Sequence, residues 1–212
     1  MRTLLYILIW APILFLPNRL LTTEPIHEYL GLIFLLLGGI HLILVRRYLK
    51  ALVTLRLRLT ALNVINAIML VLLCVVIATG ILISLYATPV VRLRGLTSIY
   101  VHEAHLAAAV TFYLIVGVHA GFHWRAIRNR ILRRLTLHMP PRATRVCNAL
   151  GILLIIAGLH AFITTHIYEK ILFEHMSFGE PAGTWKYQCD LLLIFAAYMN
   201  CALFYERLHI QK

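Results

Sequence analysis

Six long apolar segments constrain the fold of this chain more than any other feature of its sequence. Most are close to the ~20 residues that an α-helix needs to cross the hydrocarbon core of a bilayer. Lipid cannot satisfy open backbone groups and no segment reads as barrel strands, so helices are expected throughout. The sequence predicts an all-α integral membrane protein with one domain, residues 1–212, and six transmembrane helices. These helices cover approximately residues 3–21, 26–45, 62–86, 98–122, 146–168 and 188–206.

The composition agrees with this interpretation. Of the 212 residues, 61% are hydrophobic and 13% are charged, whereas a soluble domain is about 45–50% apolar and about 25% charged. The net charge of +12 comes from basic residues between apolar segments, which indicates membrane orientation rather than nucleic-acid binding. The four cysteines are scattered and no C-x-x-C-H occurs, which argues against a disulfide framework, a zinc ribbon and covalent c-type haem attachment.

The N-terminal segment has some features of a signal peptide. Arg2 precedes an apolar stretch, but no small-x-small cleavage site follows before Glu24. We therefore expect a first transmembrane helix that is bent or shortened by Pro12 and Pro17.

The charges of the loops predict how the helices are oriented. The loops after the second and fourth segments are basic and contain no acidic residue. Counted over all loops and both termini, 15 of the 20 basic residues fall on one side, and seven of the eight acidic residues fall on the other. The positive-inside rule then places both termini in the cytoplasm. The second and fourth helices both run from outside to inside, so they are expected to be parallel.

These two helices each carry a pair of histidines 14 residues apart: His27 and His41 in the second, His105 and His119 in the fourth. At ~100° per residue, 14 residues turn within ~40° of a whole number of turns and rise ~21 Å. Each helix therefore presents two imidazoles on one face, one near each side of the hydrocarbon. Because the helices are parallel, His27 is expected level with His105 on the outer side, and His41 level with His119 on the inner side.

Such an arrangement is typical of two stacked sites for b-type haem, because haem iron accepts a neutral imidazole nitrogen on each axial face. The six-helix bundle would then contain a haem-binding four-helix core. The fourth helix offers alternative ligands, since His102 precedes His105 by three residues and His123 follows His119 by four. Either could instead contact a propionate or a quinone. We favour His105 and His119, because His105 and His123 are ~27 Å apart and do not match the second helix.

Other residues have both a haem-related and a structural interpretation. Arg46 and Arg125, just beyond helix ends, would pair with haem propionates or would only set the membrane orientation. Glycines near the inner histidines would admit a flat macrocycle or would serve close helix packing. These glycines are Gly38, Gly39, Gly117 and Gly121.

Near the outer face the sequence is less specific. Residues 168–187 are too apolar for a plain linker and are expected to cap the outer haem or to dock a partner. Because His166 and His175 lie near this face, the sequence leaves open whether a third haem is bound. His160, in the fifth helix, is expected to be a hydrogen-bonded core residue.

Almost the whole chain resembles the flavinylation-associated cytochrome family of prokaryotic membranes. The resemblance lies in the order of IHEYLGLIFLLLGGIHLIL, LNVINAIMLVLLCVVIATGILIS and HEAHLAAAVTFYLIVGVHAGFHW, and in the tail LHAFITTHIYEKILFEHMSFGEPAGTWKYQCDLLLIFAAYMN. It implies a small cytochrome of the cytoplasmic (inner) membrane that holds two non-covalent haem b groups on His27, His41, His105 and His119. Its implied electron acceptor is an extracytoplasmic protein with covalently bound FMN. No flavin is expected on this chain, which lacks a D-x-x-x-S-G-A-T attachment motif.

Three functions compete on the strength of the sequence. The first is an electron-transfer subunit that takes electrons from the quinol pool or a cytoplasmic-side donor. The second is a membrane di-iron hydroxylase or desaturase, suggested by His102-x2-His105 and His119-x3-His123. The third is a scaffold or transport subunit with structural histidines. The first is favoured, because di-iron ligands must cluster at one side of the membrane and these are divided between two levels. The oligomeric state is left open.

Overall fold

The computed structural model describes residues 2–136, 140–174 and 183–210, and within these ranges the chain forms helices and no strand. Five of the helices, α3, α5, α6, α7 and α9, are long and apolar enough to cross a membrane. The predicted all-α fold is therefore confirmed for the described residues, and the length and composition of these five helices fit a multi-pass membrane protein. The elements are α1 (Arg2–Phe15), α2 (Arg19–Thr22), α3 (Glu24–Leu44), α4 (Arg46–Val53), α5 (Ala61–Ile83), η1 (Pro89–Val91), α6 (Leu96–Arg134), α7 (Pro141–Thr164), α8 (Ile167–Ile171) and α9 (Thr184–Ile210).

The helix predicted over residues 3–21 is broken. α1 contains Pro12 and ends at Phe15, and Pro17 lies in the turn that follows. Asn18 then caps the short α2 by accepting a hydrogen bond from the Leu21 amide. The 14 residues of α1 rise about 21 Å, less than the ~30 Å of hydrocarbon. A sixth crossing therefore stays a prediction.

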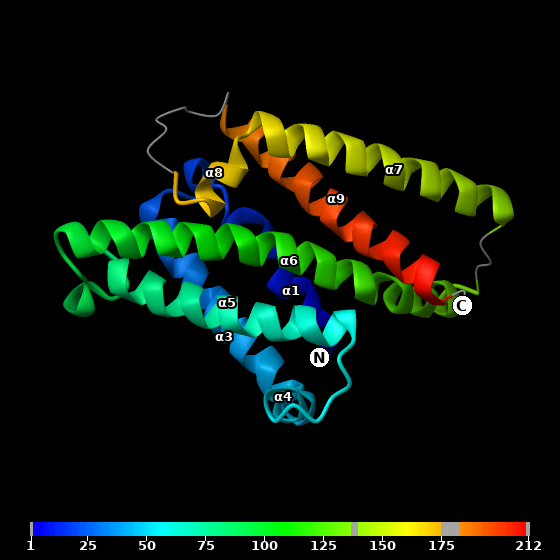
Figure 1. Ribbon diagram of the computed structural model, residues 1–212, viewed down its shortest axis with the longest axis horizontal. Helices are drawn as coiled ribbons and strands as arrows, with labels where there is room; N and C mark the ends of the chain where they lie inside the picture. Colours follow the sequence, from blue (N-terminus) through cyan, green and yellow to red (C-terminus); the bar gives the residue numbers. More distant parts are fainter. Residues whose placement is uncertain (1, 137–139, 175–182, 211–212) are drawn as a thin grey trace.

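Helices α6, α7 and α9 form the tightly packed part of the bundle (Figure 1). A Cβ atom on Gly121 of α6 would lie 2.3 Å from the Met199 carbonyl oxygen of α9. One on Gly158 of α7 would lie 2.5 Å from the Leu193 carbonyl oxygen, on another face of the same helix. Because only glycine permits so close an approach of backbones, α9 is held between α6 and α7. Leu191 of α9 is fully buried there.

Helix α3 is attached far more loosely. It packs mainly on α1, contacts α5 and α6 sparsely, and has no buried residue. Its strongest polar tie is the Glu28 carboxylate, which accepts a hydrogen bond from Ser84 Oγ at 2.8 Å. The same carboxylate accepts from three successive amides, Leu85 at 2.7 Å, Tyr86 at 2.8 Å and Ala87 at 2.9 Å. The N-terminal end of α3 is thus fastened to the turn that follows α5.

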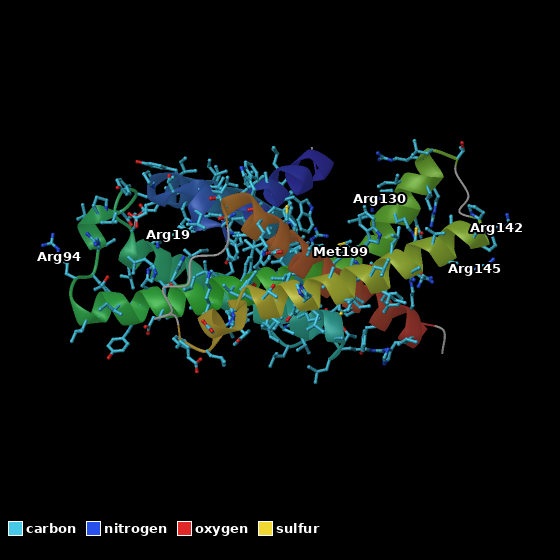
Figure 2. The ribbon with its side chains drawn as sticks, turned by 90° about the horizontal axis from the view of Figure 1, so that it is seen from above. Arg19, Arg94, Arg130, Arg142, Arg145 and Met199 are labelled. Atoms are coloured by element: carbon cyan, nitrogen blue, oxygen red, sulfur yellow. The ribbon has the colours of Figure 1, made fainter. Side chains whose placement is uncertain are left out.

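Basic residues lie at both ends of the bundle. Figure 2 shows Arg130, Arg142 and Arg145 at one end and Arg19 and Arg94 at the other. These are the two sides to which the order of the helices assigns them, and which side faces the cytoplasm stays a prediction. The basic loop after α3 contains a helix, α4, that the apolar pattern of the sequence does not predict. It is short and amphipathic, and in Figure 1 it lies beyond the end of α3.

Candidate functional site

Two histidines meet between α3 and α6 at the level that the loop charges predict on the outer side, which is called the outer level below, and the other level the inner one. The ring centres of His27 and His105 are 6.4 Å apart, with an angle of 76° between the ring planes. His105 is oriented by α5, because its Nδ1 donates to the Val76 carbonyl oxygen at 3.1 Å and lies 3.1 Å from Thr79 Oγ1. Gly80 makes room for the ring, since a Cβ there would lie 3.1 Å from His105 Cε1. With Nδ1 used in this way, Nε2 is the nitrogen left for a ligand.

The distance between the two rings suits a shared metal. Metal–imidazole bonds are about 2.0–2.1 Å long and a ring nitrogen lies about 1.2 Å from the ring centre, so two imidazoles on opposite sides of one metal have centres about 6.4–6.6 Å apart. The observed 6.4 Å falls within this range. It is also an ordinary distance for an edge-to-face aromatic contact, so the orientation of His105 by α5 is the more specific observation.

His27 itself has an unused polar atom. Its Nδ1 is buried and has no hydrogen-bond partner among the described residues, although the Leu16 carbonyl lies near the ring. Two further polar residues, His102 and Arg19, are close enough to interact electrostatically with both His27 and His105. A buried, unpartnered nitrogen is costly in an apolar surrounding, which is consistent with a ligand at this place.

The inner level repeats the pattern with different partners. His119 Nδ1 lies 2.8 Å from Asn66 Oδ1 of α5, so α5 also orients this histidine. The His123 ring lies 4.5 Å from the His119 ring, at an angle of 58°. His41 interacts electrostatically with both His119 and His123. Asn66 and Gly80 are 14 residues apart, so α5 serves the two levels from one face.

An aromatic pair lies between the two levels. Phe34 of α3 contacts Phe112 of α6, with ring centres 6.0 Å apart. Phe34 is seven residues from His27 and from His41, and Phe112 is seven residues from His105 and from His119. The pair keeps α3 and α6 in register and separates the outer from the inner histidines.

The glycines divide between the two interpretations given to them. Gly117 and Gly121 face α9, where a Cβ would lie 3.1 Å from the Phe195 carbonyl oxygen and 2.3 Å from that of Met199, respectively. They are therefore helix-packing residues. A Cβ atom on Gly38 or Gly39 of α3 would have no neighbouring atom within 4 Å. Their side of α3 has room for a flat group beside His41.

The structure also bears on the choice between neighbouring histidines. His105 and His119 are the two that α5 orients through Nδ1, and both are half-buried. His123 is exposed and interacts electrostatically with Glu206 of α9. His102 is half-buried like His105, so the hydrogen bond of His105 to α5 is what distinguishes the two. This geometry favours His105 and His119, and their role as ligands stays a prediction.

Some expectations about other residues fail or fall outside the described ranges. His160 is exposed on α7 rather than placed in the core, because α7 packs on α9 through its glycine face. The His166 side chain interacts with its neighbours in the sequence, with Nδ1 2.9 Å from Tyr168 Oη and 3.1 Å from Glu169 Oε1. Of the segment 168–187, residues 175–182 lie outside the described residues, including His175.

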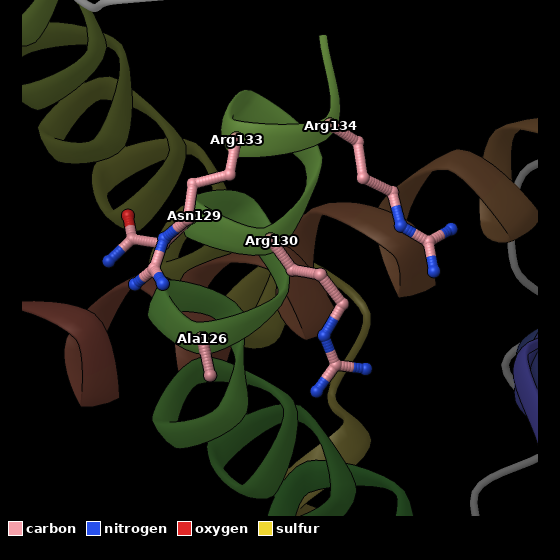
Figure 3. Close-up of a pocket in the computed structure, with 5 residues that line it drawn as sticks. All are labelled: Ala126, Asn129, Arg130, Arg133 and Arg134. Carbon is pink, nitrogen blue, oxygen red and sulfur yellow. The ribbon is translucent and has the colours of Figure 1, made fainter. Parts of the chain in front are cut away.

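The two arginines expected near propionates are both exposed. Arg46 begins α4 and Arg125 lies in the C-terminal part of α6. Further along α6, Ala126, Asn129, Arg130, Arg133 and Arg134 line a pocket of about 430 Å³ (Figure 3). None of the paired histidines lines it, so this pocket does not belong to the candidate site.

Among the described residues, no group of three or more His, Cys, Asp or Glu side chains is arranged to hold a metal ion. A di-iron centre needs such a group, whereas a haem with two axial histidines needs only one imidazole on each side. The structure therefore gives the di-iron alternative no support.

Several residues of the site were missed from the sequence. The residues that were not singled out are Asn66, Thr79 and Tyr48, and Tyr48 contacts Asn66. Asn66 could have been noticed, because it is a polar residue inside an apolar segment. Such residues are costly in lipid and usually have a buried partner, and that signal identifies Asn66 in retrospect.

Comparisons of the chain with protein-family models, with curated proteins and with solved structures found no match.

Proposed function

We propose that this chain is a b-type cytochrome of a prokaryotic inner membrane, which carries electrons across the bilayer between two bis-histidine haems. His27 and His105 would hold the outer haem, and His41 and His119 the inner one. When bound, each haem would supply one-electron transfer, because two axial imidazoles leave no open coordination position.

One observation carries the proposal. Two of the four histidines of α6, His105 and His119, have Nδ1 engaged by α5, at 3.1 Å to Val76 and 2.8 Å to Asn66, and each lies near a histidine of α3. A metal-binding histidine is typically fixed in this way by its other ring nitrogen. A purely structural histidine needs no such duplication at two levels 14 residues apart.

The protein's own residues would do the remaining work. α3 and α6 present the imidazoles, α5 orients two of them, and the apolar side chains between the levels exclude water. Gly38 and Gly39 leave space beside the inner pair. This is how a membrane bundle positions a cofactor and tunes its potential through ligands, burial and hydrogen bonds.

The membrane topology and the redox partners complete the proposal. With α1 and α2 counted as a sixth crossing, both termini are cytoplasmic, as the basic loops indicate. A quinol or a cytoplasmic-side donor would deliver electrons. The family resemblance supports an extracytoplasmic FMN-bearing protein as acceptor, and this protein should reoxidise the reduced cytochrome.

The test is a haem count with reduced-minus-oxidised spectra on the purified chain. Two haems per chain are expected. His27→Ala and His105→Ala should remove the same haem, and His41→Ala and His119→Ala the other. His160→Ala is the matched control, because it changes an exposed histidine in a spanning helix, and it should keep both haems. A wild-type protein with one haem or none refutes the proposal.

A further inference from the structure

A chain of hydrogen bonds runs from His119 to the loop between α4 and α5. Asn66 Nδ2 donates to Tyr48 Oη at 2.6 Å. Tyr48 Oη donates to Asn63 Oδ1 at 2.7 Å, and Asn63 Nδ2 donates to the Arg58 carbonyl oxygen at 2.9 Å. Tyr48 comes from α4, while the two asparagines are one turn apart on α5.

The far end of this chain fixes its direction. A backbone carbonyl can only accept, so Asn63 must present its NH₂ group to Arg58 and its oxygen to Tyr48. Tyr48 then donates its proton to Asn63, and its oxygen accepts from the Asn66 NH₂ group. The Asn66 oxygen is thereby turned toward His119, and it accepts only from a protonated Nδ1.

We infer that the Arg58 carbonyl, acting through Asn63, Tyr48 and Asn66, fixes the His119 proton on Nδ1 and selects Nε2 as its metal-binding nitrogen. This inference deepens the proposed function and rests on it for the tuning of the inner haem. Asn66 and Tyr48 are positioning residues. Through them the α4–α5 loop adjusts the inner site independently of the outer one, because His105 donates to a backbone carbonyl that belongs to α5 itself.

The two levels should therefore differ in ligand strength. A hydrogen bond from Nδ1–H makes the imidazole a stronger donor, which stabilises ferric over ferrous iron. The inner bond is the shorter, 2.8 Å against 3.1 Å. Loss of the Asn66 acceptor should raise the midpoint potential of the inner haem alone.

The first measurement is the tautomer of His119, by ¹⁵N NMR on the full chain labelled at histidine and prepared without haem, with helicity checked by circular dichroism. His119→Ala assigns the signal. The wild type should hold the Nδ1–H form. Tyr48→Phe, which does not touch His119, should raise the Nε2–H fraction about fivefold, the effect of losing one ordinary hydrogen bond. Tyr100→Phe, on an exposed residue of α6, is the control and should change nothing.

The second measurement is the midpoint potential of each haem in Asn66→Leu and Tyr48→Phe. A rise confined to the inner haem, larger in Asn66→Leu, is expected. An unchanged tautomer ratio in both variants, or equal shifts of both haems, overturns the inference. A chain that binds no haem refutes the proposed function instead, while the NMR measurement still decides the tautomer.

Discussion

Replacing Glu28 by alanine should loosen α3 from the bundle. The carboxylate accepts four hydrogen bonds of 2.7–2.9 Å, from one hydroxyl and three consecutive amides. Three successive amides make an anion-binding concavity, and α3 has no buried side chain to compensate for its loss. Glu28 is therefore the residue on which the position of His27 depends most.

The magnitude follows from the geometry. Hydrogen bonds to a charged group contribute about 1.5–3 kcal/mol each, but four bonds to one part-exposed carboxylate are not additive, and water replaces some of them, so we expect about 2–4 kcal/mol in all. For a chain of this size each kcal/mol lowers Tm by about 2–4 °C, which predicts a fall of about 5–15 °C. Glu28→Gln keeps one acceptor oxygen and should lose about half as much.

The assay is thermal unfolding of the full chain in detergent, followed by circular dichroism. Glu24→Ala is the matched control, because Glu24 lies one turn earlier on α3 and pairs with the exposed Arg19. Surface pairs contribute about 0–1 kcal/mol, so this variant should unfold close to the wild type. If Glu28→Ala unfolded at the same temperature as Glu24→Ala, the carboxylate would not fasten α3 and the reasoning would be wrong.

Two other perturbations separate packing from space for a ligand. Gly121→Ala should destabilise the chain by about 1–3 kcal/mol, because the added Cβ would clash with the Met199 carbonyl oxygen. The Cβ added by Gly39→Ala has no neighbouring atom within 4 Å, so this variant should leave Tm unchanged or raised while lowering haem content. Equal Tm values for the two variants would contradict this. Asn18→Ala should lower the free energy of unfolding by about 1–3 kcal/mol, measured in the same way, since the buried amide donates to the Thr184 carbonyl and to Gln188 Oε1 at 3.1 Å; an unchanged Tm would show that water replaces those bonds.

Apolar length was enough to predict the main helices. The five candidate crossings lie where long hydrophobic runs predict them, because lipid leaves the backbone no alternative to helix. The first helix is shortened, as Pro12 and Pro17 predict, and ends at Phe15. The helix α4 was missed, because its amphipathic turns contain too few apolar residues to register as a crossing.

The sequence predicts the two levels of imidazoles in the candidate site, but not the residues that contact and orient them. The 14-residue spacing predicts two imidazole levels, because helical periodicity depends on sequence separation alone. The partners of those imidazoles depend on how helices dock, which one sequence does not reveal. Thus Asn66 was overlooked, and Gly117 and Gly121 could not be assigned until α9 was seen against them.

The loose attachment of α3 has a consequence for the order of assembly. α3 leaves the ribosome before α5, α6, α7 and α9, yet the glycine-mediated contacts that lock helices together belong to the later ones. We therefore expect the order of consolidation to differ from the order of synthesis. On this expectation the C-terminal helices pack first, and α3 docks on them last, through Glu28 at one end and the Phe34–Phe112 contact at the middle. The side of α6 that carries His105 and His119 would then stay accessible until α3 docks.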